Sequence, residues 1–295
     1  MNKTLKGYMM LLTACFMFGI TFPIGKGILE SYSVSAYMGL RYGFAAIIMT
    51  VIFFKKLKFN DFDAIKKAGI LSCVIGLATI LEITGLKSIM AMESGLYGSL
   101  NVIFIPIMAL IFLKEKSSII KVVSLLISFS GILLINYNGG SLSFSTGAIL
   151  TILSAAVYAF NVIVMKKILK EDDNIVNIST IQFYIMTLGY MALSFFNGTL
   201  NVTSGGLKSL VIIAMLSVFA QVIGYPLFVG AQKYLKPIET SVLSTSTPVF
   251  AMILSFLIIG ETMGIKSIIG SVLIIAGVLV SNVEFKKKKV GVLNG

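Results

Sequence analysis

The sequence predicts an all-α membrane protein whose ten transmembrane helices form two inverted repeats of five helices each. Three observations lead to this fold class. The chain of 295 residues is 57% hydrophobic and only 12% charged, with a mean hydropathy of +0.98, whereas soluble domains contain about a quarter charged residues. Its apolar residues come in blocks of about 20. Its two halves also repeat one another at a constant spacing.

Each block is long enough to cross a membrane as a helix. A hydrocarbon core of roughly 30 Å requires about 20 apolar residues. The ten blocks are 7–27, 34–54, 67–87, 93–113, 119–137, 146–165, 177–197, 208–230, 239–259 and 266–283. The links are too short for a soluble domain. The first block is too long for a cleavable signal and lacks a small-residue cleavage site.

The basic residues predict the orientation. A net charge of +12 would suggest nucleic acid, but 19 of the 24 Lys and Arg residues lie in the termini and in alternate links, as the positive-inside rule requires. They are Lys3, Lys6, Lys55, Lys56, Lys58, Lys66, Lys67, Lys114, Lys116, Lys121, Lys166, Lys167, Lys170, Lys233, Lys236 and the four lysines of 286–289. We therefore expect a multi-pass protein of the cell membrane, with both termini in the cytoplasm and no nucleic-acid partner.

The sequence offers little for catalysis or for a cofactor. It contains no histidine, and its two cysteines, Cys15 and Cys73, lie inside apolar blocks, where they are expected to be small packing residues. There is no cysteine pair at metal-ligand spacing, no glycine-rich phosphate loop after a strand and no serine nucleophile elbow. We expect no metal, no cofactor and no enzymatic activity.

The internal repeat is the strongest functional signal. Four pairs stand 146 residues apart: Glu93 and Glu239, Glu115 and Glu261, Gly131 and Gly277, and Asn136 and Asn282. These pairs predict a first five-helix repeat at 1–138, a second at 146–286 and a cytoplasmic tail at 287–295. Because five is odd, the second copy must enter the membrane from the opposite side. An inverted repeat of this kind lets a protein open alternately to either face around a central site.

Several phrases of the sequence resemble a known family. "PVFAMILSFLIIGE" and "IIGSVLIIAGVLVSN" look like the second repeat of the EamA family, in the drug/metabolite transporter superfamily; "GLKSIMAMESGLYGSLNVIFIPIMALIFLKEK" looks like the first repeat, and "FGITFPIGKGI" like the first helix. The resemblance implies export of amino acids, metabolites or drugs, with relatives that carry nucleotide sugars and triose phosphates. One departure is that Pro106 lies nine residues before its glutamate whereas Pro248 lies thirteen before, so the two halves should bend differently.

The glutamates that close two blocks predict structural pins. Glu115 and Glu261 each stand where one block ends and the next begins. A carboxylate at this position can accept hydrogen bonds from the free N–H groups that open the next helix, here 119–137 and 266–283, and can stabilise its positive dipole end. A gating role is the alternative.

Polar residues inside four blocks predict a substrate site near mid-membrane. They lie beside or near prolines, which remove backbone hydrogen bonds inside helices, and polar groups at this depth require partners or a cavity. The predicted substrate-binding residues are Tyr97, Asn101, Tyr158, Asn161, Gln221, Tyr225, Thr245 and Thr247. Ordinary interhelical hydrogen bonding is the alternative for each of them. Because none of the eight is charged, they suit a neutral or zwitterionic solute such as an amino acid; hydrophobic drugs rank second and phosphorylated sugars last.

Arg41 and Glu82 are expected to form an ion pair. Arg41 lies about 12 Å deep and Glu82 about 7.5 Å deep from the outer side, at about 1.5 Å per residue. The corresponding positions of the second copy, Gln182 and Phe228, lack both charges together. The alternatives are snorkelling to the headgroups and proton coupling through Glu82.

The leading interpretation is therefore a secondary transporter, an exporter or facilitator of small organic solutes such as amino acids, working in the lipid bilayer by alternating access. The alternatives are a drug or cation exporter coupled to protons through Glu82, a membrane-embedded enzyme and a scaffold. Blocks 119–137 and 266–283 hold small residues before their ends. They are expected to face lipid or to pack, and a homodimer seam is a further alternative for them.

Overall fold

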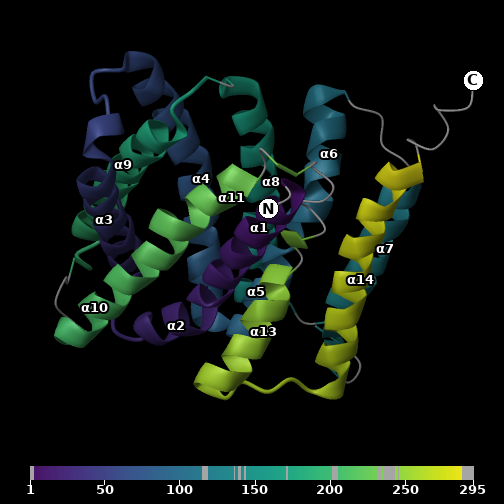
Figure 1. Cartoon of the computed structure of the whole chain (residues 1–295). Helices are drawn as coiled ribbons and strands as arrows, with labels where there is room; N and C mark the ends of the chain where they lie inside the picture. The colour runs from purple at the N-terminus through teal and green to yellow at the C-terminus, as the bar shows by residue number, and fades with distance from the viewer. Residues whose placement is uncertain are drawn as a thin grey trace, which may run out of the picture.

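The chain forms helices along almost all of its described length (Figure 1). The structure is a computed structural model, and it describes residues 3–114, 119–135, 137–138, 141–142, 144–170, 172–200, 205–231, 234–235, 243–244 and 246–287. Its helices are α1 (Lys3–Gly19), α2 (Thr21–Ile28), α3 (Val34–Phe53), η1 (Phe54–Lys56), α4 (Phe62–Ser88), α5 (Ala91–Gly98), α6 (Asn101–Leu113), α7 (Ile119–Ile135), α8 (Thr146–Ile168), α9 (Ile175–Phe196), α10 (Gly206–Ser217), η2 (Val218–Gly224), α11 (Tyr225–Ala231), α13 (Ser246–Ile259) and α14 (Ile265–Lys287). A short antiparallel pair, β1 (Tyr137–Asn138) and β2 (Ser141–Leu142), lies between α7 and α8.

The lengths and compositions of the helices make this a multi-pass helical membrane protein. Seven spans within the described residues are long and apolar enough to cross a membrane: Leu5–Ile28, Val34–Lys56, Phe62–Ser88, Ala91–Phe112, Thr146–Met165, Ile175–Phe196 and Gly206–Phe228. Three shorter apolar helices overlap the other predicted blocks, at Leu126–Ile135, Ser246–Ile259 and Ile265–Val280. The seven longer spans match predicted blocks one for one, and the count of ten stays a prediction.

Two of the span prolines lie in the first turn of a helix, and a third follows a π-turn. The first span is interrupted at Ile20, and Pro23 follows in α2. The span that ends in α11 passes through the π-helix η2 immediately before Tyr225 and Pro226. Pro248 lies in the first turn of α13. At Pro23 and Pro248 the proline replaces an N–H that has no helical partner in any case. Pro226 instead stands inside a continuous helix, where the π-turn of η2 comes directly before it.

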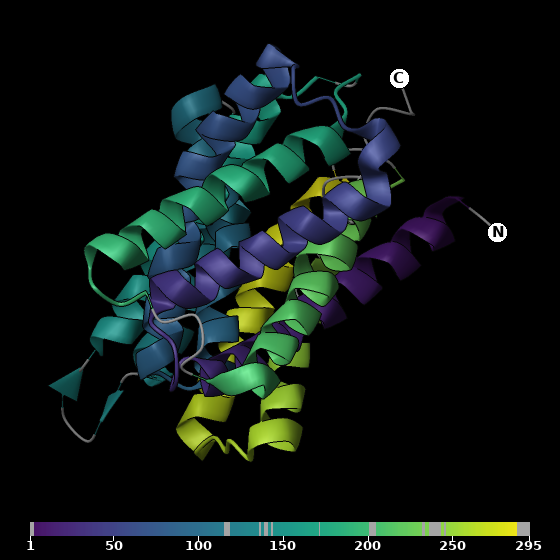
Figure 2. The same ribbon diagram turned by 90° about the vertical axis from the view of Figure 1, so that its left-hand side faces the viewer.

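Helices of the first half pack mainly against helices of the second. α3 lies beside α9, α5 beside α13, and α7 beside α14 (Figures 1 and 2). α4 packs on α8, and α1 packs on both η2 and α11. The two halves are therefore interleaved and do not form two separate bundles.

Small residues allow α7 and α14 to approach closely. A Cβ placed on Gly131 would lie 2.5 Å from the carbonyl oxygen of Gly270, and a Cβ placed on Gly277 would lie 2.7 Å from that of Ser124. The Ser128 hydroxyl donates to the Ile274 carbonyl at 3.2 Å. Helices in lipid associate through such small-residue contacts because the bilayer supplies no hydrophobic driving force between them. The two segments therefore pack against each other within one chain, as one of the expectations for them stated. The homodimer seam stays a prediction.

Replacing Gly277 by alanine should destabilise the α7–α14 pair. The new methyl group would contact the Ser124 carbonyl and the Ser128 backbone, and overpacking of this kind costs about 1–3 kcal/mol. Gly69→Ala is the matched control, because a Cβ there meets no atom within 4 Å among the described residues. Thermal unfolding in detergent measures both variants. Equal melting temperatures for the two would contradict the packing described here.

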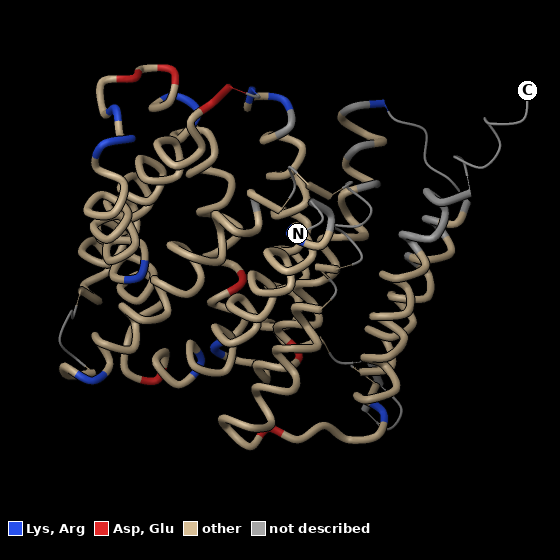
Figure 3. The backbone as a smooth tube through the Cα atoms, viewed as in Figure 1, with Lys and Arg blue, Asp and Glu red and all other residues tan. Residues whose placement is uncertain are grey.

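Charged residues gather mainly at one end of the helices, here called the basic end, which contains the α3–α4 and α8–α9 links (Figure 3). The Lys67 ammonium contacts Asp173 at 2.7 and 2.9 Å and Asp63 at 2.6 Å. Asn177 accepts from the Lys58 backbone N–H at 2.8 Å. Desolvation alone would raise the pKa of Asp173, but its bond to Lys67 and the Lys170 backbone N–H bring that pKa below its ordinary value. These contacts connect the α3–α4 link and the start of α4 to the α8–α9 link and the start of α9.

Candidate functional site

Arg41 lies at the centre of a buried polar cluster. It is 6% exposed and belongs to α3, one turn after Tyr37. Its Nε donates to Oε1 of Gln221 at 3.3 Å, and its terminal nitrogen donates to the Tyr37 hydroxyl at 3.3 Å. Gln221 reaches the guanidinium from η2, where the wide π-turn precedes Pro226. A π-turn inside a helix frequently marks a functional position.

Glu82 is held by Tyr158. The Tyr158 hydroxyl on α8 donates to Oε2 of Glu82 on α4 at 2.9 Å. The two helices approach closely because glycines face one another: a Cβ on Gly85 would lie 2.7 Å from the carbonyl oxygen of Gly147. This close packing brings the phenol of Tyr158 to the carboxylate.

The predicted ion pair between Arg41 and Glu82 is therefore wrong as a direct contact. Both residues are described, and no Arg41 nitrogen lies within 4.0 Å of a Glu82 oxygen. The reason is helix packing. Because α4 packs on α8, the Tyr158 hydroxyl lies against Glu82, and η2 places the Gln221 side chain against Arg41. We treat the two charges as members of one polar cluster, because α3, which carries Arg41, packs on α4, which carries Glu82.

Three further residues extend this cluster between α3, α4 and α9. The Thr79 hydroxyl contacts the Tyr190 hydroxyl, which donates to the Gly76 carbonyl at 2.7 Å. The Tyr42 ring stacks on the Tyr190 ring with centroids 6.0 Å apart. Sequence analysis did not select Tyr37, Tyr42, Thr79 or Tyr190. The available signal was that Tyr37 stands four residues before Arg41 and Thr79 three residues before Glu82.

Other predicted site residues lie elsewhere in the helical assembly. Asn161 on α8 donates from Nδ2 to the Met165 sulfur at 3.5 Å, and its buried Oδ1 has no partner among the described residues. Tyr225 opens α11 and meets the Phe183 ring edge-on at 6.2 Å. Asn101 opens α6, and Thr247 lies half-buried in the first turn of α13. Thr245 and Glu115 fall outside the described residues.

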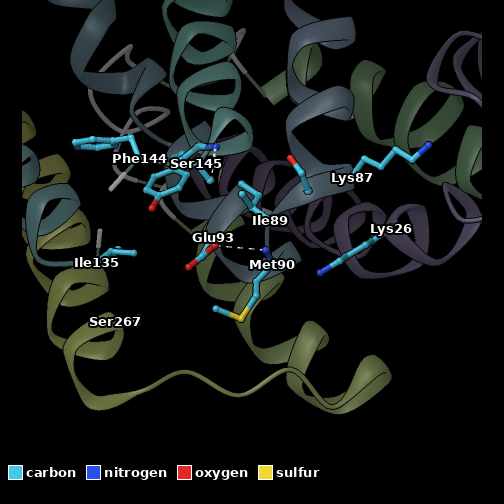
Figure 4. A pocket seen from close by; sticks show the side chains of 12 residues that line it. Lys26, Lys87, Ile89, Met90, Glu93, Ile135, Phe144, Ser145 and Ser267 are labelled. Atoms are coloured by element: carbon cyan, nitrogen blue, oxygen red, sulfur yellow. Dashed lines mark hydrogen bonds between the residues drawn. The ribbon is translucent and has the colours of Figure 1, made fainter. Parts of the chain in front are cut away.

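A cavity of about 640 Å³ lies at the end of the helices opposite the basic end (Figure 4). Of the eight predicted substrate-binding residues, the cavity is lined by Tyr97, which is 1% exposed. Its charged lining consists of Glu93 on α5, Lys26 on α2 and Lys87 near the end of α4. The volume is within the range of about 300–1,000 Å³ typical of small-molecule sites.

Glu261 joins the two halves beside this cavity. Its Oε1 accepts from the Lys26 ammonium at 2.7 Å and from the Ala91 backbone N–H at 2.9 Å. Its Oε2 accepts from the Met92 backbone N–H at 3.0 Å. Gly260 adopts the left-handed conformation (φ +66°) immediately after α13, which turns the chain at this point.

The predicted role of Glu261 is therefore right in its chemistry and wrong in its helix. The carboxylate does accept the free N–H groups at a positive helix end, but the helix is α5 of the first half, where the expected helix was 266–283. The non-helical stretch 260–264 separates Glu261 from α14, so the side chain is free to reach across the halves. Glu93 caps the same α5 terminus, because its Oε2 accepts from the Met90 N–H at 3.4 Å.

The polar cluster and the cavity offer hydroxyls, amides and single charges. Within the described ranges, no group of three or more His, Cys, Asp or Glu residues could hold a metal ion.

Comparison with known proteins agrees with a transport role. The model of the EamA-like transporter family matches the chain twice, at residues 5–137 and 145–283. An uncharacterized transporter of Bacillus subtilis (strain 168), YyaM, is 26% identical over 95% of this chain and 94% of its own length. An uncharacterized transporter of Acidianus ambivalens is 28% identical over 88% of this chain and 98% of its own.

The fold also has a solved counterpart. One crystal structure, described only as that of a protein, superimposes with a TM-score of 0.63 at 13% identity and covers 95% of this chain and 98% of that one. This likeness concerns the fold alone. The matches to the family model, by contrast, cover nearly the whole length of both halves, and the chain is thus a membrane protein that belongs to the EamA-like transporter family.

Proposed function

We propose that the protein is a secondary transporter, an exporter or facilitator of small organic solutes such as amino acids, and that it works by alternating access across ten spans. The observation that carries this proposal is the arrangement of the two halves. They interleave helix by helix, a cavity lies at one end, and polar contacts between the halves close the basic end. None of this requires a catalytic group.

The pairing of helices supports the inverted repeat. Numbered by predicted block, helix 2 meets helix 7 (α3 and α9), helix 4 meets helix 9 (α5 and α13), and helix 5 meets helix 10 (α7 and α14). These three helices of the first half each meet their own counterpart, whereas helix 3 meets helix 6 (α4 and α8) and helix 1 meets helix 8 (α1 with η2 and α11). A pseudo-twofold axis in the membrane plane would produce this pattern, because it exchanges the last two pairs. The family model also matches twice, with limits within a few residues of the proposed repeats 1–138 and 146–286.

The two ends of the molecule support alternating access. At the basic end, Lys67 and Asp173 join α4 to the α8–α9 link. At the other end, the cavity reaches Tyr97. This combination fits a state closed toward the predicted cytoplasmic side and accessible from the opposite side, and the contact between Lys67 and Asp173 would have to break for the basic end to open.

The polar residues support a solute without large fixed charge. The buried cluster contains one cation, Arg41, and one acid, Glu82, among tyrosines and an amide. Phosphorylated sugars would need several basic groups close together, whereas Arg41 is the basic residue of this cluster and the two cavity lysines stand beside the acids Glu93 and Glu261.

A second candidate function is proton-coupled export of drugs or cations. Glu82 favours it, because an ionisable acid within a span usually marks a functional site, proton relays among them. Its Oε2 accepts a hydrogen bond from the Tyr158 phenol. Proton coupling and amino-acid transport are compatible, so coupling is tested separately from substrate.

Counterflow in proteoliposomes tests the proposed function. Purified protein should exchange at least one member of a panel of amino acids, nucleotide sugars and cationic drugs. We expect Asn101→Ala and Asn161→Ala to weaken that exchange about tenfold, because each removes one polar contact worth about 1–1.5 kcal/mol. Lys208→Gln, an exposed change on α10, is the control. Unchanged exchange in both variants would exclude these two asparagines from the pathway, and no exchange of any solute would contradict the proposed function.

Single-cysteine labelling tests the proposed orientation. In a variant without Cys15 and Cys73, Lys58→Cys and Lys170→Cys should react with an impermeant maleimide only from the cytoplasmic side, because both belong to the basic end. Lys208→Cys, in the exposed first turn of α10, should react only from outside. Reaction of either basic-end cysteine from outside would refute the orientation.

A further inference from the structure

Apolar rings and lysines are exposed together where α3 connects to α4, at the basic end (Figure 3). Phe54 in η1 is 72% exposed, and Phe62, which begins α4, is 80% exposed. The lysines between them are exposed as well. We call this surface the aromatic–basic patch, which consists of Phe54, Lys55, Lys56, Lys58 and Phe62. Aromatic rings and lysines at the end of a membrane span are typical of residues that lie at the level of the lipid headgroups.

The patch lysines carry charges that no acid of the described residues neutralises by contact. Within that part of the chain, no carboxylate oxygen lies within 4.0 Å of the ammonium of a patch lysine. The neighbouring acids have other partners: Asp61 accepts from a backbone N–H as the N-cap of α4, and Asp63 contacts the Lys67 ammonium at 2.6 Å. The patch therefore presents three positive charges to an anion from outside the chain.

The corresponding link of the second half lacks this combination. Residues 169–174 contain Glu171, Asp172 and Asp173 and no aromatic residue. The positive-inside rule explains lysines at both links, but it does not explain why the first link adds exposed phenylalanines.

Hydrogen bonds to the start of α9 hold the backbone of the patch. The Asn174 side-chain amide donates to the Lys56 carbonyl at 2.8 Å. The Asn177 side chain accepts from the Lys58 N–H at 2.8 Å and donates to the Lys58 carbonyl at 3.1 Å. Because this backbone is fixed, less conformational entropy is lost when the lysine side chains order around one anion.

We propose that the aromatic–basic patch binds an anionic phospholipid of the adjacent leaflet. The phosphate group of the lipid binds the lysine ammonium groups, and its acyl chains lie beside the rings of Phe54 and Phe62. The negative surface potential of the cytoplasmic leaflet attracts lysines near the membrane surface, and the orientation proposed above places the patch at that leaflet. The lipid site is additional to the solute pathway and does not depend on the proposed transport function.

The surface beside the patch favours a lipid over a soluble anion. Val51 and Ile52, in the last turn of α3, are 75% and 58% exposed and continue the apolar surface of this span up to Phe54. A soluble phosphate would contact the lysines alone, whereas a phospholipid matches both the charges and the apolar surface.

Fluorescence quenching in proteoliposomes tests the proposal. The chain contains no tryptophan, so Phe54→Trp places a single fluorophore in the patch. The probes are brominated phosphatidylglycerol and brominated phosphatidylcholine, each mixed at the same mole fraction into phosphatidylcholine vesicles, because bromine quenches tryptophan only at short range. The anionic probe should bind at least about fivefold more tightly, the equivalent of one lysine near the membrane surface. Phe196 is 83% exposed at the end of α9 away from the basic end, and Phe196→Trp is the control, which should show no preference.

Two matched double variants in the Phe54→Trp protein separate a defined site from general attraction. Lys55→Gln combined with Lys58→Gln should abolish the preference for the anionic probe. Lys167→Gln combined with Lys170→Gln removes the same charge from exposed positions of the same end, at the close of α8 and in the α8–α9 link. This second double variant should keep the preference.

Equal quenching by the two probes in Phe54→Trp would overturn the proposal. An equal loss of preference in both double variants would also overturn it, because the net charge of the basic end would then attract the lipid without a defined site. Raising the ionic strength from about 0.1 M to about 1 M shortens the Debye length to about 3 Å, which should weaken the preference without any lysine substitution. A preference that is unchanged at high salt would exclude the lysines as the binding groups. These measurements need no transported solute, so their outcome is independent of counterflow.

Discussion

Glu261→Ala should lower the free energy of unfolding by about 3 kcal/mol. The carboxylate is 10% exposed and makes three charge-assisted hydrogen bonds, to the Lys26 ammonium and to the backbone N–H groups of Ala91 and Met92. The substitution leaves an ammonium and two helix-end donors without their acceptor in a partly buried place. Because the contacts connect the second half to α2 and α5, we also expect the relation between the halves to loosen.

A double-mutant cycle with Lys26→Met measures the ion pair. Lys26→Met alone should be milder, because Glu261 keeps both backbone donors. The double variant should lose less than the sum of the single losses, with a coupling of about 0.5–3 kcal/mol. Glu30→Ala is the matched control, an exposed acid of the α2–α3 link. Thermal unfolding in detergent reports all four variants. If Glu261→Ala behaves like Glu30→Ala, the carboxylate does not connect the halves.

Arg41→Gln should destabilise the protein by about 3 kcal/mol, because breaking a buried charge network by removing one member leaves uncompensated polar groups. Arg41 is almost fully buried, and Gln221 and Tyr37 both lose their partner. Glu82→Gln should be milder, since an amide oxygen can still accept from Tyr158. The double variant should lose less than the sum. Strict additivity would show that the two charges act independently despite belonging to one cluster.

The same residues test proton coupling. If Glu82 carries the coupled proton, Glu82→Gln should abolish uptake driven by a pH gradient while leaving counterflow intact, because an amide cannot release a proton in this range. Tyr158→Phe, which removes the hydrogen bond and keeps the acid, should retain pH-driven uptake. Loss of counterflow as well in Glu82→Gln would indicate a binding or structural role in place of coupling.

Much of the fold could be predicted because each membrane span is decided locally. The free energy of transferring a helix into lipid is summed over its own residues, so the blocks at 34–54 and 177–197 are recognisable without their partners. The internal repeat could also be found from the sequence, because it requires only matching residues at a constant spacing. The resemblance of motifs such as "PVFAMILSFLIIGE" also led to the family that the comparison identifies.

The partners of individual side chains could not be predicted in the same way. Glu261 was recognised as an acid that caps a helix, but the choice between α14 and α5 depends on the turn at Gly260 and on how α13 packs against α5. Arg41 and Glu82 were expected to meet because their depths agree. Depth fixes only the position of a side chain along the membrane normal. Its position within the membrane plane depends on helix packing, here on the place of η2 and on the close contact of Gly85 with α8.

The sequence by itself thus determined that this is a helical membrane protein with two related halves and an acid poised at a helix end. Tertiary structure alone decided which helix that acid holds, which polar residues form the cluster around Arg41, and which residues line the cavity opposite the basic end. The physical reason is that insertion into lipid depends on the composition of single segments, whereas contact between segments depends on small residues and short polar contacts. Many apolar helices of similar composition could pack in several ways, and a few close contacts, such as Gly85 with Gly147 and Gly131 with Gly270, select one arrangement.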